Sequence, residues 1–279
     1  MGRPSRTCGA AFLHALHHLC MSLSDQLLKF GHGNAKLPNT TMTFALPAGF
    51  TCPGALHCLS KADPISGKIT DGPHTLFRCS AASEETRPSV RKARHHNWSL
   101  LRGLNAGAIT DLIDLSLRAQ VRSYTERVRW FTSGDCFGAP LREALIETAR
   151  RHSALLFYLY SKNLPLWLEG GVPRSLPDNL VLTASWGGRY DFLLADGLFD
   201  RTARVVNTQE EAYALGLALD FTDALAYQST PTHFAHLVHG TQPKHSIAGQ
   251  AIQQRRAAGQ FSGYSRHNTH AHSLPVTAG

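Results

Sequence analysis

Between residues 41 and 239, short apolar segments alternate with amphipathic segments of helical period. The short segments predict strands at 41–46, 127–132, 154–160, 180–185, 203–207 and 234–239. Helices are predicted at 84–104, 108–119, 140–152, 164–169 and 209–215. Strands separated by helices indicate right-handed βαβ units and a mostly parallel sheet, so the fold class is α/β. We expect a (β/α) barrel-like or partial-barrel fold, with an open doubly wound sheet as the alternative.

The two ends of the chain lack this alternation. Residues 10–19 are largely apolar and follow Arg3 and Arg6, but histidines interrupt the segment and no small-residue cleavage site follows, which argues against a secretory signal. We therefore interpret residues 1–29 as an N-terminal extension, poorly ordered at least to residue 20. Residues 30–243 form a single predicted domain. Residues 244–279 are predicted to be a mobile tail with a short helix near 249–258.

The composition is that of a globular protein. Of 279 residues, 43% are hydrophobic and 17% are charged, which excludes a chain that is disordered throughout. No apolar run approaches the roughly 18 residues of a membrane-spanning helix. A net charge of +8 is compatible with a polyanionic partner, and equally with none. The chain carries no phosphate-binding loop, dinucleotide fingerprint, nucleophile elbow or zinc-protease motif, so these chemistries lack support.

Three cysteines lie in the long loop after the strand at 41–46. Cys52, Cys58 and Cys79 have the spacing C-x5-C-x20-C, and thiolates select zinc, copper(I) or iron–sulfur clusters. A [4Fe–4S] cluster held by three cysteines leaves one iron open to a ligand. The alternatives are unrelated buried thiols, or a structural zinc completed by a nearby histidine or aspartate. The odd number of thiols disfavours a disulfide. Cys136 remains unassigned.

Polar residues follow four of the predicted strands. They are Asp135, Lys162, Arg189 and His239. Because parallel strands present their carboxyl ends at one edge of a sheet, we expect these side chains to line a shared mouth that binds a cofactor or small molecule. The alternative for each is an ordinary turn, cap or surface residue.

The predicted helix at 84–104 is strongly basic. Arg87, Arg91, Arg94 and Trp98 form a face that would track phosphates and stack a base. The alternative is a solvated basic helix that shields the cysteine loop.

Several motifs resemble the gene-product-88 family of mycobacteriophages and related mobile elements. They include Lys36-Leu37-Pro38, Thr51-Cys52-Pro53-Gly54-Ala55, Phe77-Arg78-Cys79, Ser133-Gly134-Asp135, Gly187-Gly188-Arg189 and His239-Gly240-Thr241-Gln242-Pro243. The resemblance covers about residues 30–243 and implies a cytoplasmic protein of a bacterial host or phage-infected cell. The resemblance implies a lineage more than an activity.

A more distant similarity is to radical SAM enzymes. In those enzymes the cluster cysteines also follow the first barrel strand, and a motif ending the second strand contacts SAM. Here Ser133-Gly134-Asp135 has a comparable position, but the usual C-x3-C-x2-C is absent. The departure puts SAM binding in doubt.

We therefore predict an iron–sulfur protein that holds a [4Fe–4S] cluster through Cys52, Cys58 and Cys79, with SAM or another small molecule as a candidate ligand. The competing hypothesis is a zinc-stabilised nucleic-acid-binding module that has no enzymatic activity.

Overall fold

The computed structural model describes residues 25–169, 171 and 175–264. The predicted features at residues 1–20 and in the last fifteen residues lie outside this part of the chain. Eight strands form one sheet in the order β1-β2-β5-β6-β7-β8-β10-β9. Their bounds are β1 Phe30–His32, β2 Thr41–Ala45, β5 Arg127–Ser133, β6 Leu156–Ser161, β7 Leu180–Ser185, β8 Thr202–Val206, β9 Ala218–Leu219 and β10 His233–Leu237. All neighbouring pairs are parallel except β1–β2.

The α/β class and the mostly parallel sheet are confirmed. In the described part of the chain, no pairing joins β1 to β9, so the sheet is an open partial barrel. The sequence missed β1, whose three residues are too few for a periodic pattern. The helices are α2 Ser80–Glu84, α3 Pro88–Leu101, α4 Ala106–Gln120, α5 Ala139–Arg151, α6 Leu164–Leu168, α7 Phe192–Ala195, α8 Gln209–Ala214 and α9 Ile247–Ala257, with a 3-10 turn, η2, at Ala224–Ala226.

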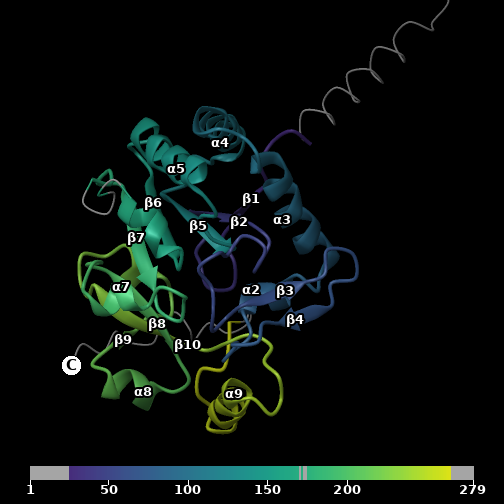
Figure 1. Ribbon diagram of the computed structural model, residues 1–279, viewed down its shortest axis with the longest axis vertical. Helices are drawn as coiled ribbons and strands as arrows, with labels where there is room; N and C mark the ends of the chain where they lie inside the picture. Colours follow the sequence, from purple (N-terminus) through teal and green to yellow (C-terminus); the bar gives the residue numbers. More distant parts are fainter. Residues whose placement is uncertain (1–24, 170, 172–174, 265–279) are drawn as a thin grey trace, which may run out of the picture.

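The two faces of the sheet differ: the largest hydrophobic core lies on one, and the other, here called the polar face, carries charged and polar residues beside a smaller apolar cluster. Met42, Phe44, Val128, Trp130 and Phe157 join the largest hydrophobic core, which α4 and α5 cover with Ile109, Ile113, Leu141 and Leu145 among others. Figure 1 shows α3, α4 and α5 along this side of the sheet. Alternate residues point the other way because side chains in a strand alternate between faces. Thr43, Arg129 and Tyr160 therefore line a cavity on the opposite face.

Two elements near the cysteine loop differ from the sequence prediction. The helix expected over 84–104 is present as α3, which begins only at Pro88, a residue suited to the first turn because its missing N–H would have no helical acceptor there; a separate short helix, α2, precedes it. The region expected to be an irregular loop contains an antiparallel hairpin, β3 Ser60–Ala62 with β4 Ile69–Asp71. The hairpin and α2 lie together beside the lower end of α3 in Figure 1.

The predicted helix near 249–258 is present as α9, and it packs on the sheet domain. Ala248 and Ile252 join a small core with Val238. The Arg255 guanidinium donates hydrogen bonds to the Val238 carbonyl at 2.5 Å and to the Phe261 carbonyl at 3.0 Å. The predicted domain boundary at residue 243 therefore falls before a helix that contributes to the core.

Candidate metal centre

The cysteine loop covers the carboxyl ends of β2 and β5. The Leu46 N–H bonds to the Ser133 carbonyl at 2.9 Å, and the Asp135 N–H bonds to the Thr51 carbonyl at 3.1 Å. A bulge in β5 allows this contact. Thr43 pairs with Arg129 and Ala45 pairs with Ser133, so β5 contains extra residues between the two pairs. Gly134 completes the turn at φ +80°, and a Cβ there would lie 2.5 Å from the Thr51 hydroxyl. The motif Ser133-Gly134-Asp135 thus anchors the loop.

The first half of the loop packs against the ends of β6 and β7. A Cβ on Gly54 would lie 2.0 Å from the Lys162 carbonyl oxygen, so the close approach of the two backbones requires glycine. The Gly54 carbonyl accepts the Arg189 N–H at 2.9 Å, and the His57 N–H bonds to the Gly187 carbonyl at 2.9 Å. Cys52 and Cys58 are therefore held between strand ends that are distant in sequence.

Cys79 is positioned by a different set of contacts. The Arg78 guanidinium pairs with the Asp71 carboxylate of β4, with an Nη2–Oδ2 distance of 2.6 Å. The Gln242 side chain bonds to both backbone groups of Arg78, accepting from its N–H at 2.8 Å and donating to its carbonyl at 2.9 Å. Gly240, at φ +81°, lies against Ser80. The segment 239–243 thus secures the chain immediately before Cys79, which directly precedes α2.

The three predicted ligands lie close enough to influence one another. Burial raises the pKa of Cys52 well above its usual range, and the negative charges of Asp135, Cys79 and Cys58 raise it further. Burial and the neighbouring Cys58 likewise raise the pKa of Cys79, to about 11, although the N–H groups of Ala81 and Ala82 lower it. The Gly49 N–H donates to the Cys52 Sγ at 3.3 Å. The metal-free Cys52 and Cys79 thiols are therefore protonated at neutral pH, and metal binding would release their protons.

The spacing of these thiols bears on the kind of metal. Zinc bound at roughly 2.3 Å by three thiolates would place their sulfurs about 3.8 Å apart. In the described part of the chain, three potential ligand atoms lie within 4.8 Å of one another only at Asp220, Asp223 and His236. The three cysteine sulfurs are therefore not all within 4.8 Å of one another, and a single zinc ion bound by all three would have to draw them together.

Asp135 and Lys162 lie beside this centre. The Asp135 carboxylate is 4% exposed and accepts the Lys162 N–H at 2.8 Å and the Cys136 N–H at 2.7 Å. Burial raises the pKa of Asp135 to about 6, against the lowering effect of these hydrogen bonds. The Lys162 ammonium bonds to the Ser185 hydroxyl.

Cys136 lies in the hydrophobic core, with its Sγ 3.7 Å from the Gly138 carbonyl oxygen. It has the environment of a structural thiol.

The other two predicted mouth residues are placed differently. Arg189 is exposed and contacts the loop through its backbone N–H. His239 packs edge-on against Tyr264, with ring centroids 5.1 Å apart, and lines the cavity on the polar face of the sheet. Of the four predicted mouth residues, Asp135 and Lys162 therefore lie beside Cys52, whereas Arg189 is exposed and His239 lines the cavity.

The face of α3 that would track phosphates is largely turned inward. Arg94 is 5% exposed and bonds to the Ala81 carbonyl at 2.6 Å and to the buried Glu85 carboxylate at 3.0 Å. Arg91, also 5% exposed, donates to the Pro64 and Ile65 carbonyls of the β3–β4 hairpin. Trp98 packs on the core, and only Arg87 of the four is exposed. These arginines brace the cysteine loop, which argues against a nucleic-acid interface on this face.

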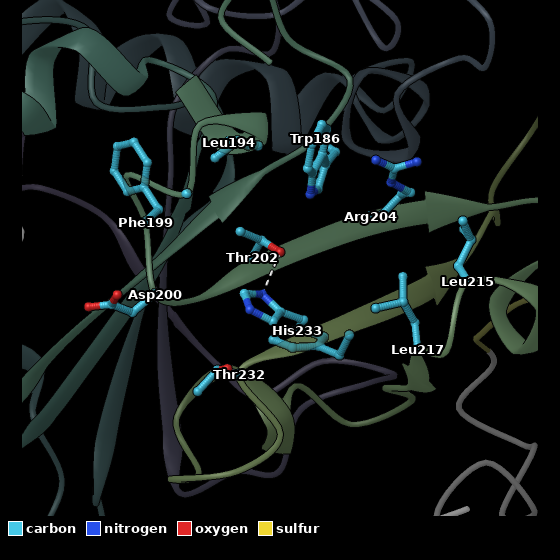
Figure 2. Close-up of a pocket in the computed structure, with 12 residues that line it drawn as sticks. Trp186, Leu194, Phe199, Asp200, Thr202, Arg204, Leu215, Leu217, Thr232 and His233 are labelled. Carbon is cyan, nitrogen blue, oxygen red and sulfur yellow. Dashed lines mark hydrogen bonds between the residues drawn. The ribbon is translucent and has the colours of Figure 1, made fainter. Parts of the chain in front are cut away.

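Two cavities flank the sheet. On the β8 face that carries Thr202 and Arg204, a cavity of about 710 Å³ has the Arg204 guanidinium 4.2 Å from the centre of the Trp186 ring. Figure 2 shows Thr202 bonded to His233 in this cavity, at 2.9 Å. The cavity on the other face measures about 1120 Å³ and extends from Ser80 and Ala81, beside Cys79, to a buried cluster around Asp223.

Sequence reasoning missed this buried cluster. Its members are Lys36, Arg129, Tyr160, Asp223 and His236. One signal was present, because Lys36 belongs to the motif Lys36-Leu37-Pro38. The others lie in strands or loops with no local pattern, and the most distant, His236, is 200 positions (236 − 36) from Lys36.

Fold and site together define an open, mostly parallel α/β protein whose strand ends carry a three-cysteine loop. The family model for Gene product 88 matches residues 23–260, and the chain belongs to that family. No curated protein and no solved structure matches the chain. None of the helices that the structure describes is long and apolar enough to cross a membrane.

Proposed function

We propose that this protein binds an iron–sulfur cluster, of the [4Fe–4S] type, through Cys52, Cys58 and Cys79. The observation that supports the proposal is the arrangement of the three thiols, which interact electrostatically although their sulfurs are not all within 4.8 Å of one another. When bound, a cluster with three cysteine ligands offers one iron to an exogenous small molecule.

The surrounding chain supplies what such a cluster needs. The Gly49 N–H faces the Cys52 sulfur, and the Ala81 and Ala82 N–H groups act on Cys79. The positive charge of Arg94 also lowers the pKa of Cys79. Hydrogen bonds and positive charge near thiolates stabilise a bound cluster and set its reduction potential.

Asp135 is the group best placed to act on a ligand at the open iron. Its carboxylate is close enough to raise the pKa of Cys52, and it is held by the Lys162 and Cys136 N–H groups. A carboxylate whose pKa is about 6 is poised to accept or donate a proton near neutral pH. SAM remains one candidate ligand, and other small chelating molecules fit the same proposal.

Anaerobic purification followed by iron, sulfide and zinc analysis tests this function. We expect a brown protein that absorbs near 400 nm and contains about four irons and four sulfides per chain. Cys52→Ala should lose the cluster because one of its three ligands is gone. Cys136→Ala is the matched control: its thiol lies in the hydrophobic core, so the variant should retain the cluster.

The opposite result is equally clear. A colourless protein with about one zinc per chain, unable to accept iron and sulfide on reconstitution, would replace the cluster with a structural zinc site.

A further inference from the structure

The cavity on the polar face of the sheet contains a cluster of charged side chains that the proposed metal centre does not use. Arg129, Tyr160 and His236 point into the cavity from β5, β6 and β10. Lys36 and Asp223 reach it from loops. The Lys36 and Arg129 side chains are 16% and 11% exposed, and that of Asp223 is 5% exposed.

Two of these buried cations share one carboxylate. Lys36 pairs with Oδ1 of Asp223, and the Arg129 Nε lies 3.0 Å from Oδ2. In the described part of the chain, Asp223 is the one carboxylate that bonds directly to either cation.

Arg129 has a donor to spare. Its Nη1 bonds to the Trp130 and Phe131 carbonyls and its Nε bonds to Asp223, whereas Nη2 has no partner in the described part of the chain. The guanidinium is held over the Tyr160 ring, 4.4 Å from its centre. A fixed guanidinium with a free N–H edge matches the oxygens of a carboxylate or phosphate.

Positive charges predominate along the rest of the cavity. Six of its lining residues are lysine or arginine and two are acidic. One of the acidic residues is Asp223, and the other, Glu84, pairs with Arg94 at 2.5 Å. Lys29, Arg87 and Arg256 are exposed at the rim. A cavity lined mostly by positive charge concentrates anionic ligands.

A metal ion fits this cluster less well. Asp220, Asp223 and His236 offer ligand atoms within 4.8 Å of one another. Both oxygens of Asp223 are already bonded to cations, however, and the His236 Nε2 lies 3.1 Å from the Tyr160 hydroxyl. A divalent ion would have to displace the lysine and the arginine.

We propose that this cavity binds a small molecule through an oxyanion group, a phosphate or a carboxylate, which is held by Arg129 and Lys36. The site requires no cluster, so it goes beyond the proposed function and can be tested in its absence. Its position beside α2 would bring the bound molecule toward Cys79.

Titration calorimetry on the purified full-length protein tests the site, with inorganic phosphate and malonate as separate probes. We expect saturable one-to-one binding of at least one probe, and the stronger of the two identifies the anion type. The double variant Lys36→Met/Asp223→Asn removes one charge of each sign and should bind about tenfold more weakly, as expected for loss of a charge-assisted hydrogen bond. Arg118→Gln, at an exposed arginine of α4 that does not line the cavity, should change affinity by less than about twofold.

Circular dichroism and thermal unfolding establish that the variants are folded. If the double variant does not fold, Arg129→Lys keeps the charge but loses the fork, and its weaker binding makes the same test. Absence of saturable binding by either probe overturns the proposal, as does equal affinity in the folded variants. Binding of Mn²⁺ that is lost in His236→Ala would also overturn it, in favour of a metal site. Repeating the titration on Cys52→Ala separates this proposal from the cluster, because anion binding should survive there.

Discussion

At the scale of single residues, Gly54 shows how closely the cysteine loop is fitted to the sheet. The backbone of the loop touches the Lys162–Asn163 peptide, and the space for a side chain is absent. In the sequence, Gly54 is visible only as part of the motif Thr51-Cys52-Pro53-Gly54-Ala55. The close approach to a strand end 108 positions later could not be read from that pattern, because it depends on where the two segments meet.

Gly54→Ala should destabilise the protein by about 1–3 kcal/mol, because the new methyl group overlaps backbone atoms that cannot move independently. It should also reduce metal content, since the displaced segment carries Cys52. Urea unfolding and metal analysis measure both effects. Gly107→Ala, in α4, is the matched control. The new methyl group would lie 3.5 Å from the nearest neighbouring atom, Asn105 Oδ1, which is an ordinary contact. The change should leave the free energy of unfolding the same or raise it by up to about 1 kcal/mol. Equal stability of the two variants would contradict the close contact.

His236 gives the buried cluster a dependence on pH. Burial, followed by the charge of Lys36, lowers the pKa of His236 to about 3, against 6.5 for an unperturbed histidine. As the pH falls, the unfolded chain therefore binds this proton at a higher pH than the folded chain does. The contribution of the neutral His236 to the free energy of unfolding is fully present above about pH 6.5 and is lost progressively as the pH drops toward 3.

Urea unfolding between pH 7.5 and pH 5 should thus show a loss of stability from this group of up to about 1.4 kcal/mol per pH unit below its unfolded pKa. The raised pKa of Asp220 acts in the opposite direction, so the comparison with His236→Gln is the test. The variant should have a flatter pH dependence than the wild type. An unchanged slope would show that His236 does not titrate as its environment implies.

At the scale of elements, the regular strands and helices followed from local pattern, and their irregularities did not. Alternation in β2 and β5 correctly separates core residues such as Phe44 and Trp130 from cavity residues such as Thr43 and Arg129. The bulge before Ser133 depends on how β2 and β5 pair with each other, which the sequence of either strand alone does not determine.

The basic helix shows the same limit. Its charged face was visible in the sequence, but whether that face meets solvent or the cysteine loop depends on packing, and Arg91 and Arg94 are buried there.

Gln242 tests how one element positions another. Gln242→Ala removes two hydrogen bonds to the backbone of Arg78 and leaves those groups without their partners, which should cost about 1–3 kcal/mol. Because Cys79 directly follows Arg78, the iron and sulfide content of the variant should fall as well. Gln250→Ala is the control, since this exposed residue makes a single weak bond of 3.4 Å to the His245 carbonyl. Full metal content in both variants would show that the segment 239–243 does not position Cys79.

At the scale of the whole molecule, α9 extends the domain beyond the boundary drawn from composition. The segment has few apolar residues, and for that reason it was assigned to a tail. Ile252 and Ala248 nevertheless face Val238 at the end of β10, and Arg255 is 3% exposed. Two or three well-placed apolar contacts are enough to attach a helix, and a count of apolar residues cannot detect them.

Ile252→Ala should lower the free energy of unfolding by about 2–4 kcal/mol, because it removes buried methyl groups from this contact. Ile247→Ala, five residues earlier on the same helix, changes a side chain that is 74% exposed and should have an effect within about 0.5 kcal/mol. Thermal and urea unfolding compare the two. If Ile252→Ala is also neutral, α9 does not pack on the domain in solution.

The sequence by itself determined the α/β class, the mostly parallel sheet, the family and the loop on which the three cysteines lie. These properties depend on local periodicity and on motifs that are continuous in the chain. The tertiary structure decided that the sheet stays open, that Asp135 joins Cys52 while Arg189 faces solvent, and that the basic helix turns its arginines inward. It also brought Lys36, Arg129 and Asp223 into one buried cluster. Such contacts join residues far apart in sequence, and local pattern carries no record of which distant segments will pack together.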